Sequence, residues 1–212
     1  MIMSQIFNLL FDQYSSHAFL DIAMEITAVF FGFASVWYSK ENNILVFPTG
    51  LISTSIFVYL LFKFELLGDM IINGYYFIMS LYGWYIWTRK VDAENVTPIS
   101  RITKSEQIIV VVIFASTLVL VYEVYQYFDM WTNWVAYVDT LTTALFFVGM
   151  WLMAKRKIEN WYFWIIADII SVPLYLYKGL TFTSIQYFGF TILAIFGFLA
   201  WKKNLSNSIQ TV

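Results

Sequence analysis

The chain has 212 residues, of which 60% are hydrophobic and only 12% charged, with a formal net charge of −2 and a mean hydropathy of +0.70. Soluble domains carry about 25% charged residues, so the composition excludes a protein whose surface is mainly in contact with water. Because the sequence has no cysteine, disulfides, thiol nucleophiles and cysteine-ligated metals are excluded as well.

The first 19 residues, "MIMSQIFNLLFDQYSSHAF", carry no basic stretch and no small-residue cleavage site. We therefore interpret them as an amphipathic lead-in rather than a signal peptide. A bilayer core about 30 Å thick requires about 20 apolar residues per helix, and seven stretches meet this need. They are Ala18–Tyr38, Asn42–Phe62, Met70–Thr88, Gln107–Tyr127, Val135–Ala154, Asn160–Tyr177 and Thr183–Trp201. The sequence predicts an all-α polytopic membrane protein with one membrane domain over residues 1–212.

The basic residues predict how this domain is oriented. With the N-terminus outside, ten of the 12 basic residues fall on the cytoplasmic side: Lys40, Arg89, Lys90, Arg101, Lys104, Lys155, Arg156, Lys157, Lys202 and Lys203. Only Lys63 and Lys178 fall outside. Cytoplasmic loops are enriched in Lys and Arg, so we expect the N-terminus outside and the C-terminus in the cytoplasm.

Two similar strings near the ends of the third and seventh spans indicate an internal repeat. "YGWYIWTRK" (82–90) and "FGFLAWKKN" (196–204) place Trp87 and Trp201 114 residues apart. The same spacing pairs Trp37 with Trp151, Gly83 with Gly197, and Glu25 with Asp139. Such periodicity predicts a duplication, with three-helix repeats over 18–88 and 135–201 joined by a linker helix at 107–127.

An odd number of spans per repeat plus one linker span leaves both halves in the same orientation. Transporters with parallel repeats bind their substrate near the bilayer midplane, between the halves. One similarity does not follow the 114-residue spacing, because Glu41-Asn42 resembles Glu159-Asn160, which lies 118 residues later. It predicts that the second helices of the two repeats differ in length.

"YGWYIW" and the stretch "KRKIENWYFWIIADIISVPLYLYKGL" (155–180) resemble the PnuC family of bacterial vitamin transporters. The resemblance covers the whole seven-span core. It implies a 3+1+3 duplication similar to SWEET transporters, often assembled as a trimer in the bacterial cytoplasmic membrane. It also implies import of nicotinamide riboside, an NAD precursor, or a related vitamin by facilitated diffusion, with phosphorylation in the cytoplasm trapping the product. No enzyme activity, cofactor, metal or nucleic acid is implied.

Asp168 is the strongest site candidate, because it lies about halfway along the sixth span. A charge at the centre of a membrane helix costs at least ~2.5 kcal/mol, so such residues usually face the bundle interior or a wet cavity. We favour a role in substrate binding over a structural hydrogen bond to a neighbouring helix. Trp164, one turn away, is a candidate aromatic wall, whereas Trp161 is expected in the interfacial aromatic belt.

The third span offers a second group of candidates, because helical spacing puts Asn73, Phe77, Ser80, Trp84 and Trp87 on one face. Large rings with interspersed polar groups suit a flat, partly polar vitamin. Helix packing, in which Ser80 permits close approach of two backbones, is the alternative.

Acidic residues recur at equivalent places in spans one and five, as Glu25 and Asp139. Asp139, Thr142 and Thr143 share a polar face. The two acids could attract a cation toward the outer opening or could form hydrogen bonds between helices. We favour the structural role for Glu25 and a role in or beside the binding site for Asp139.

The resemblance leaves the substrate open, because its riboside-transporting members tend to have Gln, Asn and Asn where this chain has Asn73, Ser80 and Asp168. Nicotinamide riboside contains a pyridinium and thiamine a thiazolium, and either cation would be favoured by an acid beside aromatic faces. Riboflavin is neutral and gives no reason for the Asp.

Three other functions compete with that of a passive importer. An intramembrane enzyme lacks the necessary groups, since the sequence has a single histidine, His17, and no HExxH or GxSxG motif. A proton-coupled carrier would use Asp168 or Asp139. A purely structural membrane protein explains neither Asp168 nor the repeat.

Overall fold

The computed structural model describes residues 19–63, 67–89, 97–129, 131, 134–177 and 181–210. Within these ranges the chain forms seven helices. They are α2 (Phe19–Lys40), α3 (Val46–Lys63), α4 (Leu67–Thr88), α5 (Lys104–Tyr127), α6 (Trp134–Ala154), α7 (Asn160–Tyr177) and α8 (Thr181–Gln210). The all-helical prediction is confirmed. The lead-in, apart from Phe19, and the basic residues Lys90 and Lys178 lie outside the described ranges.

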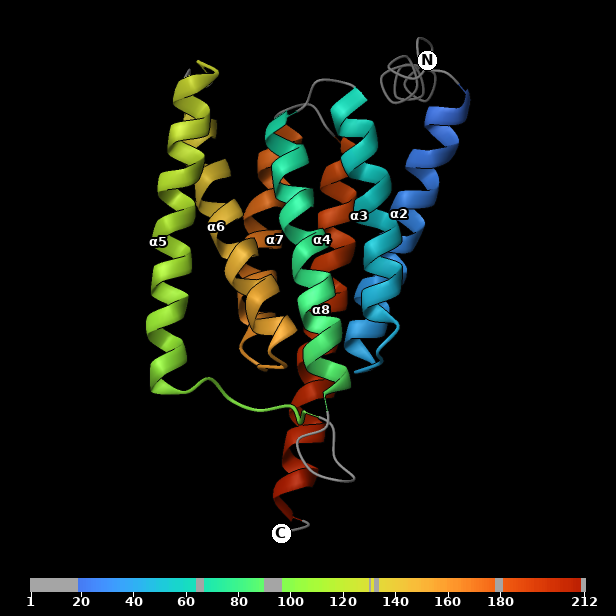
Figure 1. Cartoon of the computed structure of the whole chain (residues 1–212), viewed down its shortest axis with the longest axis vertical. Coiled ribbons are helices and arrows are strands. Elements are labelled where there is room, and N and C mark those ends of the chain that lie inside the picture. The colour runs from blue at the N-terminus through green and yellow to red at the C-terminus, as the bar shows by residue number, and fades with distance from the viewer. Residues whose placement is uncertain are drawn as a thin grey trace.

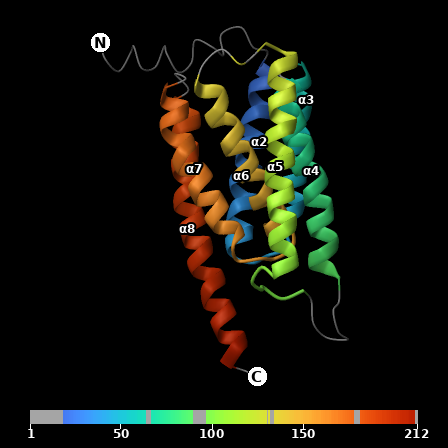
Figure 2. The same cartoon turned by 90° about the vertical axis from the view of Figure 1, so that its left-hand side faces the viewer.

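The helices run side by side and alternate in direction, so that successive connections lie at opposite ends of the bundle (Figure 1, Figure 2). The α2–α3, α4–α5 and α6–α7 connections lie at the end from which α8 and the C-terminus extend, drawn at the bottom of Figure 1. We call this the C-terminal end of the bundle and the other the opposite end.

Six of the helices form a closed ring around a central space. The neighbours around the ring are α2, α3, α4, α6, α7 and α8, and α8 packs back against α2. Helix α5 lies outside the ring, where its main contact is with α6 (Figure 1). The six ring helices are the six that were assigned to the two repeats, and α5 is the helix that was predicted as the linker; the duplication itself stays a prediction.

Five of these helices, α2, α3, α5, α6 and the Ser184–Ser206 part of α8, are long and apolar enough to cross a membrane by length and composition alone. Helices α4 and α7 fall below that threshold because they carry polar residues such as Asn73, Ser80 and Asp168. Polar groups are tolerated in membrane helices where they face protein or a cavity rather than lipid. The polar residues of α4 and α7 are therefore expected to face the interior of the bundle.

The helices of the two halves correspond closely along the sequence. Helices α3 and α7 each contain 18 residues, and their first and last residues are 114 positions apart. The expectation that the second helices differ in length is therefore wrong. We call residues 114 positions apart equivalent.

Equivalent residues also end α2 and α6. Asn42 and Arg156 both adopt positive φ values, 54° and 57°. Around Asn42, the amides of residues 42 and 43 donate to the carbonyls of Ser39 and Tyr38. The amides of residues 156 and 157 donate in the same pattern to Met153 and Leu152. Both helices thus end in a Schellman motif, which satisfies carbonyls that a helix C-terminus would leave unpaired.

Four aromatic residues, Phe47, Trp87, Trp161 and Trp201, pack together at the C-terminal end of the bundle; we call them the tryptophan cluster. The ring centroids are 5.0 Å apart for Phe47 and Trp87, 5.9 Å for Trp87 and Trp201, and 5.5 Å for Trp161 and Trp201. Trp87 Nε1 donates to the Met153 carbonyl at 3.3 Å, and Trp201 Nε1 donates to the Ser39 carbonyl at 2.8 Å. The two donors, Trp87 and Trp201, are equivalent, and so are the two acceptors, Ser39 and Met153. Each bond joins the first half of the ring to the second.

Two glycines make this packing possible. A Cβ on Gly83 would overlap the Phe47 ring, and a Cβ on the equivalent Gly197 would overlap the Trp161 ring. These close approaches explain why the "YGW" and "FGF" strings keep their glycine at the same place.

Arg156 lies in the α6–α7 connection, and its side chain bonds to the α2–α3 and α4–α5 connections at the C-terminal end of the bundle. Its Nε donates to Asn42 Oδ1 at 3.0 Å, a second guanidinium nitrogen donates to the Thr97 carbonyl, and the group lies 4.3 Å from the centre of the Trp87 ring. Burial lowers the pKa of Arg156 to about 10, so the side chain stays charged at neutral pH. Nearby, a capping box formed by Thr103 and Glu106 begins α5.

Candidate functional site

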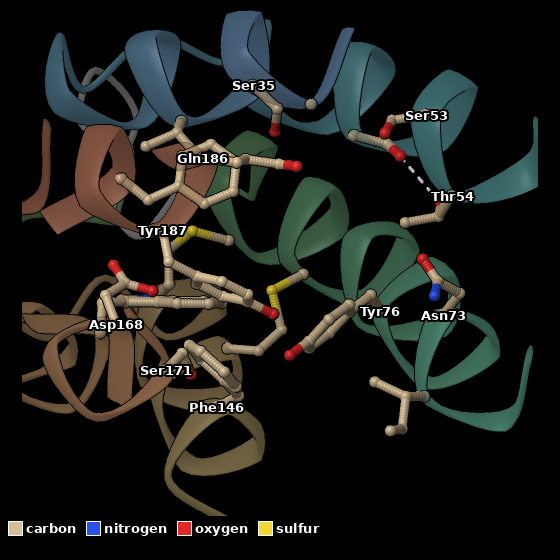
Figure 3. Close-up of a pocket in the computed structure, with 18 of the residues that line it drawn as sticks. Ser35, Ser53, Thr54, Asn73, Tyr76, Phe146, Asp168, Ser171, Gln186 and Tyr187 are labelled. Carbon is tan, nitrogen blue, oxygen red and sulfur yellow. Dashed lines mark hydrogen bonds between the residues drawn. The ribbon is translucent and has the colours of Figure 1, made fainter. Parts of the chain in front are cut away.

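The ring encloses a cavity of about 500 Å³ (Figure 3). All six ring helices contribute to its wall, and Tyr125 reaches it from α5. Pockets for small ligands usually measure about 300–1,000 Å³ and combine apolar walls with a few polar groups. The cavity therefore has the size and lining of a small-molecule site.

Eight residues were predicted for the site: Asn73, Phe77, Ser80, Trp84, Asp139, Thr143, Trp164 and Asp168. All of them except Phe77 and Trp84 lie on the wall of this cavity. They come from α4, α6 and α7, so the fold brings together residues that are up to 95 positions apart in the sequence. Whether they bind a substrate stays a prediction.

Phe77 and Trp84 do not line the cavity, and the indole of Trp84 is 38% exposed on the outside of the bundle. The face of α4 that lines it carries Asn73, Tyr76 and Ser80 instead. Neighbouring residues on a helix point about 100° apart, so choosing 77 in place of 76 rotates the predicted face toward the lipid. The correct face continues through Gly83 to Trp87, and the packing role of Gly83 was the missing signal.

Asp168 is 2% exposed and lies on the cavity wall midway along α7. Its Oδ1 atom accepts no hydrogen bond from any described residue. Ser171 Oγ, one turn further along the helix, has no partner among the described residues either. A buried carboxylate oxygen without a partner is unfavourable unless a cation or a hydrogen-bond donor reaches it. The two residues thus leave two buried polar atoms without a partner beside the cavity.

Aromatic rings surround Asp168 on its side of the cavity. Tyr187 stacks on Phe146 and on Tyr175, with centroids 5.8 Å and 5.0 Å apart. Trp164 lies 5.4 Å from Phe146 and 6.3 Å from Tyr76. Of these rings, only Trp164 was predicted as a site residue. The repeat spacing would have indicated a second, because Tyr187 is equivalent to Asn73.

The facing wall, on α2 and α3, carries several small residues, although Phe57 of α3 also lines it. Figure 3 shows Ser35, Ser53 and Thr54 across the cavity from Asp168, Ser171 and Phe146. Their hydroxyls donate to the carbonyls of Val46, Ala28 and Gly50, each at 2.8 Å. Because the hydrogens are used in this way, the oxygens offer mainly lone pairs to the cavity.

The contrast between the two walls follows from equivalent positions. Gly32 and Gly50 stand on the α2–α3 wall where Phe146 and Trp164 stand on the α6–α7 wall. Glycine in place of two large rings leaves room on one side of the ring of helices. Both acids on the wall, Asp139 and Asp168, and most of its aromatic rings therefore come from the second half of the chain.

The two acids of spans one and five differ in their surroundings. Asp139 lies on the cavity wall in α6 together with Thr142 and Thr143, nearer the opposite end of the bundle. Glu25, the equivalent residue in α2, is not among the lining residues. The site role predicted for Asp139 and the structural role predicted for Glu25 stay predictions. No group of three or more possible metal-ligating His, Asp or Glu side chains occurs in the part of the chain that the structure describes.

Trp161 departs from the expectation of an interfacial belt residue. Its side chain is 2% exposed, packs against Gly197 in the tryptophan cluster, and lines the C-terminal end of the cavity. Ser39 lines the same end from α2. The sequence analysis predicted neither residue for the site. The repeat spacing does make Trp161 equivalent to Phe47, and each of these two residues lies at the start of an apolar helix.

Comparison with known proteins identifies relatives among vitamin transporters. The family model described as nicotinamide mononucleotide transporter matches residues 22–203. The nicotinamide riboside transporter PnuC of Escherichia coli (strain K12) is 22% identical over 206 residues, covering 84% of both chains. The riboflavin/roseoflavin transporter RibM of Streptomyces davaonensis is 26% identical over 130 residues, covering 58% of both.

A solved structure supports the fold assignment. The crystal structure of the vitamin B3 transporter PnuC matches with a TM-score of 0.63 at 21% identity, covering 87% of this chain and 82% of that one. The family match covers most of the chain and includes every residue of the cavity wall. The chain therefore belongs to the nicotinamide mononucleotide transporter (PnuC) family of multi-pass membrane transporters, as the motifs at 82–87 and 155–180 had indicated.

Proposed function

We propose that this protein carries a cationic vitamin across the membrane, with nicotinamide riboside as the best candidate. The observation on which the proposal rests is Asp168, a buried acid whose Oδ1 has no partner among the described residues and which faces a cavity walled by aromatic rings. A flat cation in that cavity would meet both a negative charge and ring faces. A desolvated cation over an aromatic face gains about 2 kcal/mol.

The names of the relatives support nicotinamide riboside, since the Escherichia coli and Neisseria mucosa proteins are nicotinamide riboside transporters at 22% and 23% identity. Asn73, Ser80 and Asp168 differ from the residues expected in riboside-transporting members. Asp168 favours any cationic vitamin, so thiamine, with its thiazolium, is the second candidate. The relationship to RibM suggests riboflavin as a third candidate substrate, but its neutral isoalloxazine ring would leave the Asp168 carboxylate unpaired.

We infer passive transport, in which substrate equilibrates across the membrane and phosphorylation in the cytoplasm keeps it inside the cell. The only acids on the cavity wall within the described residues are Asp139 and Asp168. A proton-coupled carrier would use one of these two, and it is the alternative mechanism.

The proposed architecture is a parallel 3+1+3 duplication of 18–88 and 135–201 joined by the helix at 107–127. It is supported by the matching bounds of α3 and α7, the two Schellman motifs and the two equivalent tryptophan hydrogen bonds. We further propose that the C-terminal end of the bundle faces the cytoplasm of a bacterium, as the basic residues predict, and that the protein assembles as a trimer.

Uptake into proteoliposomes tests this proposal. Radiolabelled nicotinamide riboside is expected to enter until its concentrations inside and outside are equal, and excess thiamine should compete more strongly than excess riboflavin. Protein-free liposomes are the control. Accumulation above equilibrium under an imposed proton gradient would favour the proton-coupled alternative, and uptake of riboflavin alone would contradict the cationic substrate.

A further inference from the structure

Two polar atoms at the C-terminal end of the cavity have no hydrogen-bond partner within the described part of the chain. They are Ser39 Oγ and Trp161 Nε1, and each side chain belongs to a residue that is only 2% exposed. Both residues line the cavity. Buried polar groups are rarely left without a partner unless they serve a ligand or a water molecule.

The two residues lie on either side of Trp201. Trp201 Nε1 donates to the Ser39 carbonyl at 2.8 Å, and the Trp201 ring meets the Trp161 ring edge-on at 5.5 Å. Trp201 thus fixes the Ser39 backbone and the Trp161 indole without using either of the free atoms. The position of both free groups is therefore set by the tryptophan cluster.

These groups are separated from Asp168 along the cavity. Trp161 precedes Asp168 by seven residues on α7, a rise of about 10 Å at 1.5 Å per residue. The cavity therefore has two places with unpaired polar atoms, one at Asp168 and Ser171 and one at Ser39 and Trp161. A ligand that occupies both must be elongated and must carry a polar group away from its charged ring.

The chemistry of the second place differs from that of the first. An indole N–H only donates, whereas a serine hydroxyl both donates and accepts. An alcohol can accept from Trp161 Nε1, and it can donate to Ser39 Oγ or accept from it. A cation cannot accept from the indole N–H, and a carboxylate, although it could accept from both groups, would bring a second buried charge into the cavity.

We propose that Ser39 and Trp161 form a subsite for the primary alcohol of the transported vitamin, an inference that rests on the proposed function. Nicotinamide riboside, thiamine and riboflavin each carry a CH2OH group outside their ring system, so the subsite does not depend on which of them is the substrate. The vitamin binds with its ring near Asp168 and its alcohol toward the C-terminal end of the bundle.

The test compares a vitamin with an analogue in which CH3 replaces CH2OH, using equilibrium binding to purified full-length protein. Nicotinamide riboside and 5′-deoxy nicotinamide riboside are the first pair, and the same comparison is made for any of the three vitamins that binds. The wild type is expected to prefer the alcohol by about tenfold, because the analogue leaves two buried polar atoms unpaired.

Trp161→Phe removes the N–H, and the fold should tolerate it because Phe47 fills the equivalent place against Gly83. This variant is expected to lower the preference to about twofold by weakening binding of the alcohol alone. Trp87→Phe is the matched control: its Nε1 bonds to Met153 and it does not line the cavity, so the tenfold preference should remain. Ser39→Ala, which keeps the backbone bond to Trp201, is expected to reduce the preference by a few fold and provides a second measurement if Trp161→Phe is unstable.

An unchanged preference in both Trp161→Phe and Ser39→Ala would overturn the subsite, as would equal binding of alcohol and analogue by the wild type. Either result leaves the proposed transport of a cationic vitamin standing. Failure of all three vitamins to bind the wild type would instead refute the proposed function, and the subsite with it.

Discussion

Replacing Asp168 by Asn removes the negative charge from the cavity while preserving the shape of the side chain and one carbonyl acceptor. The carboxylate is 2% exposed and its Oδ1 has no partner in the described chain, so a bound cation would meet it with little screening by water. A hydrogen bond to a charged group contributes roughly 1.5–3 kcal/mol. The Asn retains part of this, and we expect a loss of at least about 1.4 kcal/mol, or tenfold in Kd, for a cationic vitamin.

The assay is equilibrium binding of nicotinamide riboside and of its reduced, uncharged form to wild type and variant. Only the oxidised form carries the pyridinium charge, so the reduced form should bind both proteins with similar affinity. Asp139→Asn is the matched control, because Asp139 also lies on the cavity wall but nearer the opposite end of the bundle. It should weaken binding of the cation less than Asp168→Asn does.

Equal losses for the charged and uncharged ligands would refute the reasoning, because they would mean that Asp168 supports the fold rather than the cation. A gain in affinity for the oxidised form would also contradict it, and would show that this site prefers the Asn expected in riboside-transporting members.

Other substitutions test the packing and the cavity wall. Gly197→Ala should lower the melting temperature measurably, because its Cβ would overlap the Trp161 ring, whereas Gly74→Ala, with open space around its Cβ, should not; an equal effect of the two would contradict the packing described. Tyr76→Leu should weaken vitamin binding several fold, whereas Trp84→Leu should leave the Kd within about twofold, since only Tyr76 lines the cavity; the reverse order in a binding assay would return the site to the face first predicted. Arg156→Ala should lower the melting temperature by removing the bonds to Asn42 and Thr97, and Lys202→Ala, whose ammonium lies 5.9 Å from the Phe198 ring, is the control expected to change it little.

The helices themselves could be predicted because each apolar run is long enough to span a bilayer and is bounded by polar residues. The resulting bounds agree with the structure to within a few residues for most helices; α8, predicted to end at Trp201, continues to Gln210. That extension is polar, "KKNLSNSIQ", and hydrophobicity gives no reason for it to be helical.

The cavity could be predicted only in part. Asp168 could be located because a charged residue in an apolar span is rare in itself. The aromatic wall could not, because 21% of the residues are aromatic and only a minority of the described ones line the cavity. Spacing on one helix narrows the choice to a broad face, and an error of one residue replaced Tyr76 by Phe77.

The spacing of 114 residues contained more information than was drawn from it. Applied to Asn73 and Tyr76 it indicates Tyr187 and Phe190, and all four lie on the cavity wall. The competing spacing of 118 residues was misleading because it pairs two identical residue types, Glu and Asn. The positive φ angles at Asn42 and Arg156 instead repeat at 114 residues, although the two side chains are unrelated. Backbone conformation at a helix end can be kept by different residues, and a comparison of letters does not detect that.

The most direct test of a cationic substrate is a side-by-side titration of purified wild-type protein with nicotinamide riboside, thiamine and riboflavin. The account predicts measurable binding of nicotinamide riboside, weaker or comparable binding of thiamine, and no binding of riboflavin at the same concentrations. Tight binding of riboflavin with no binding of either cation would contradict it.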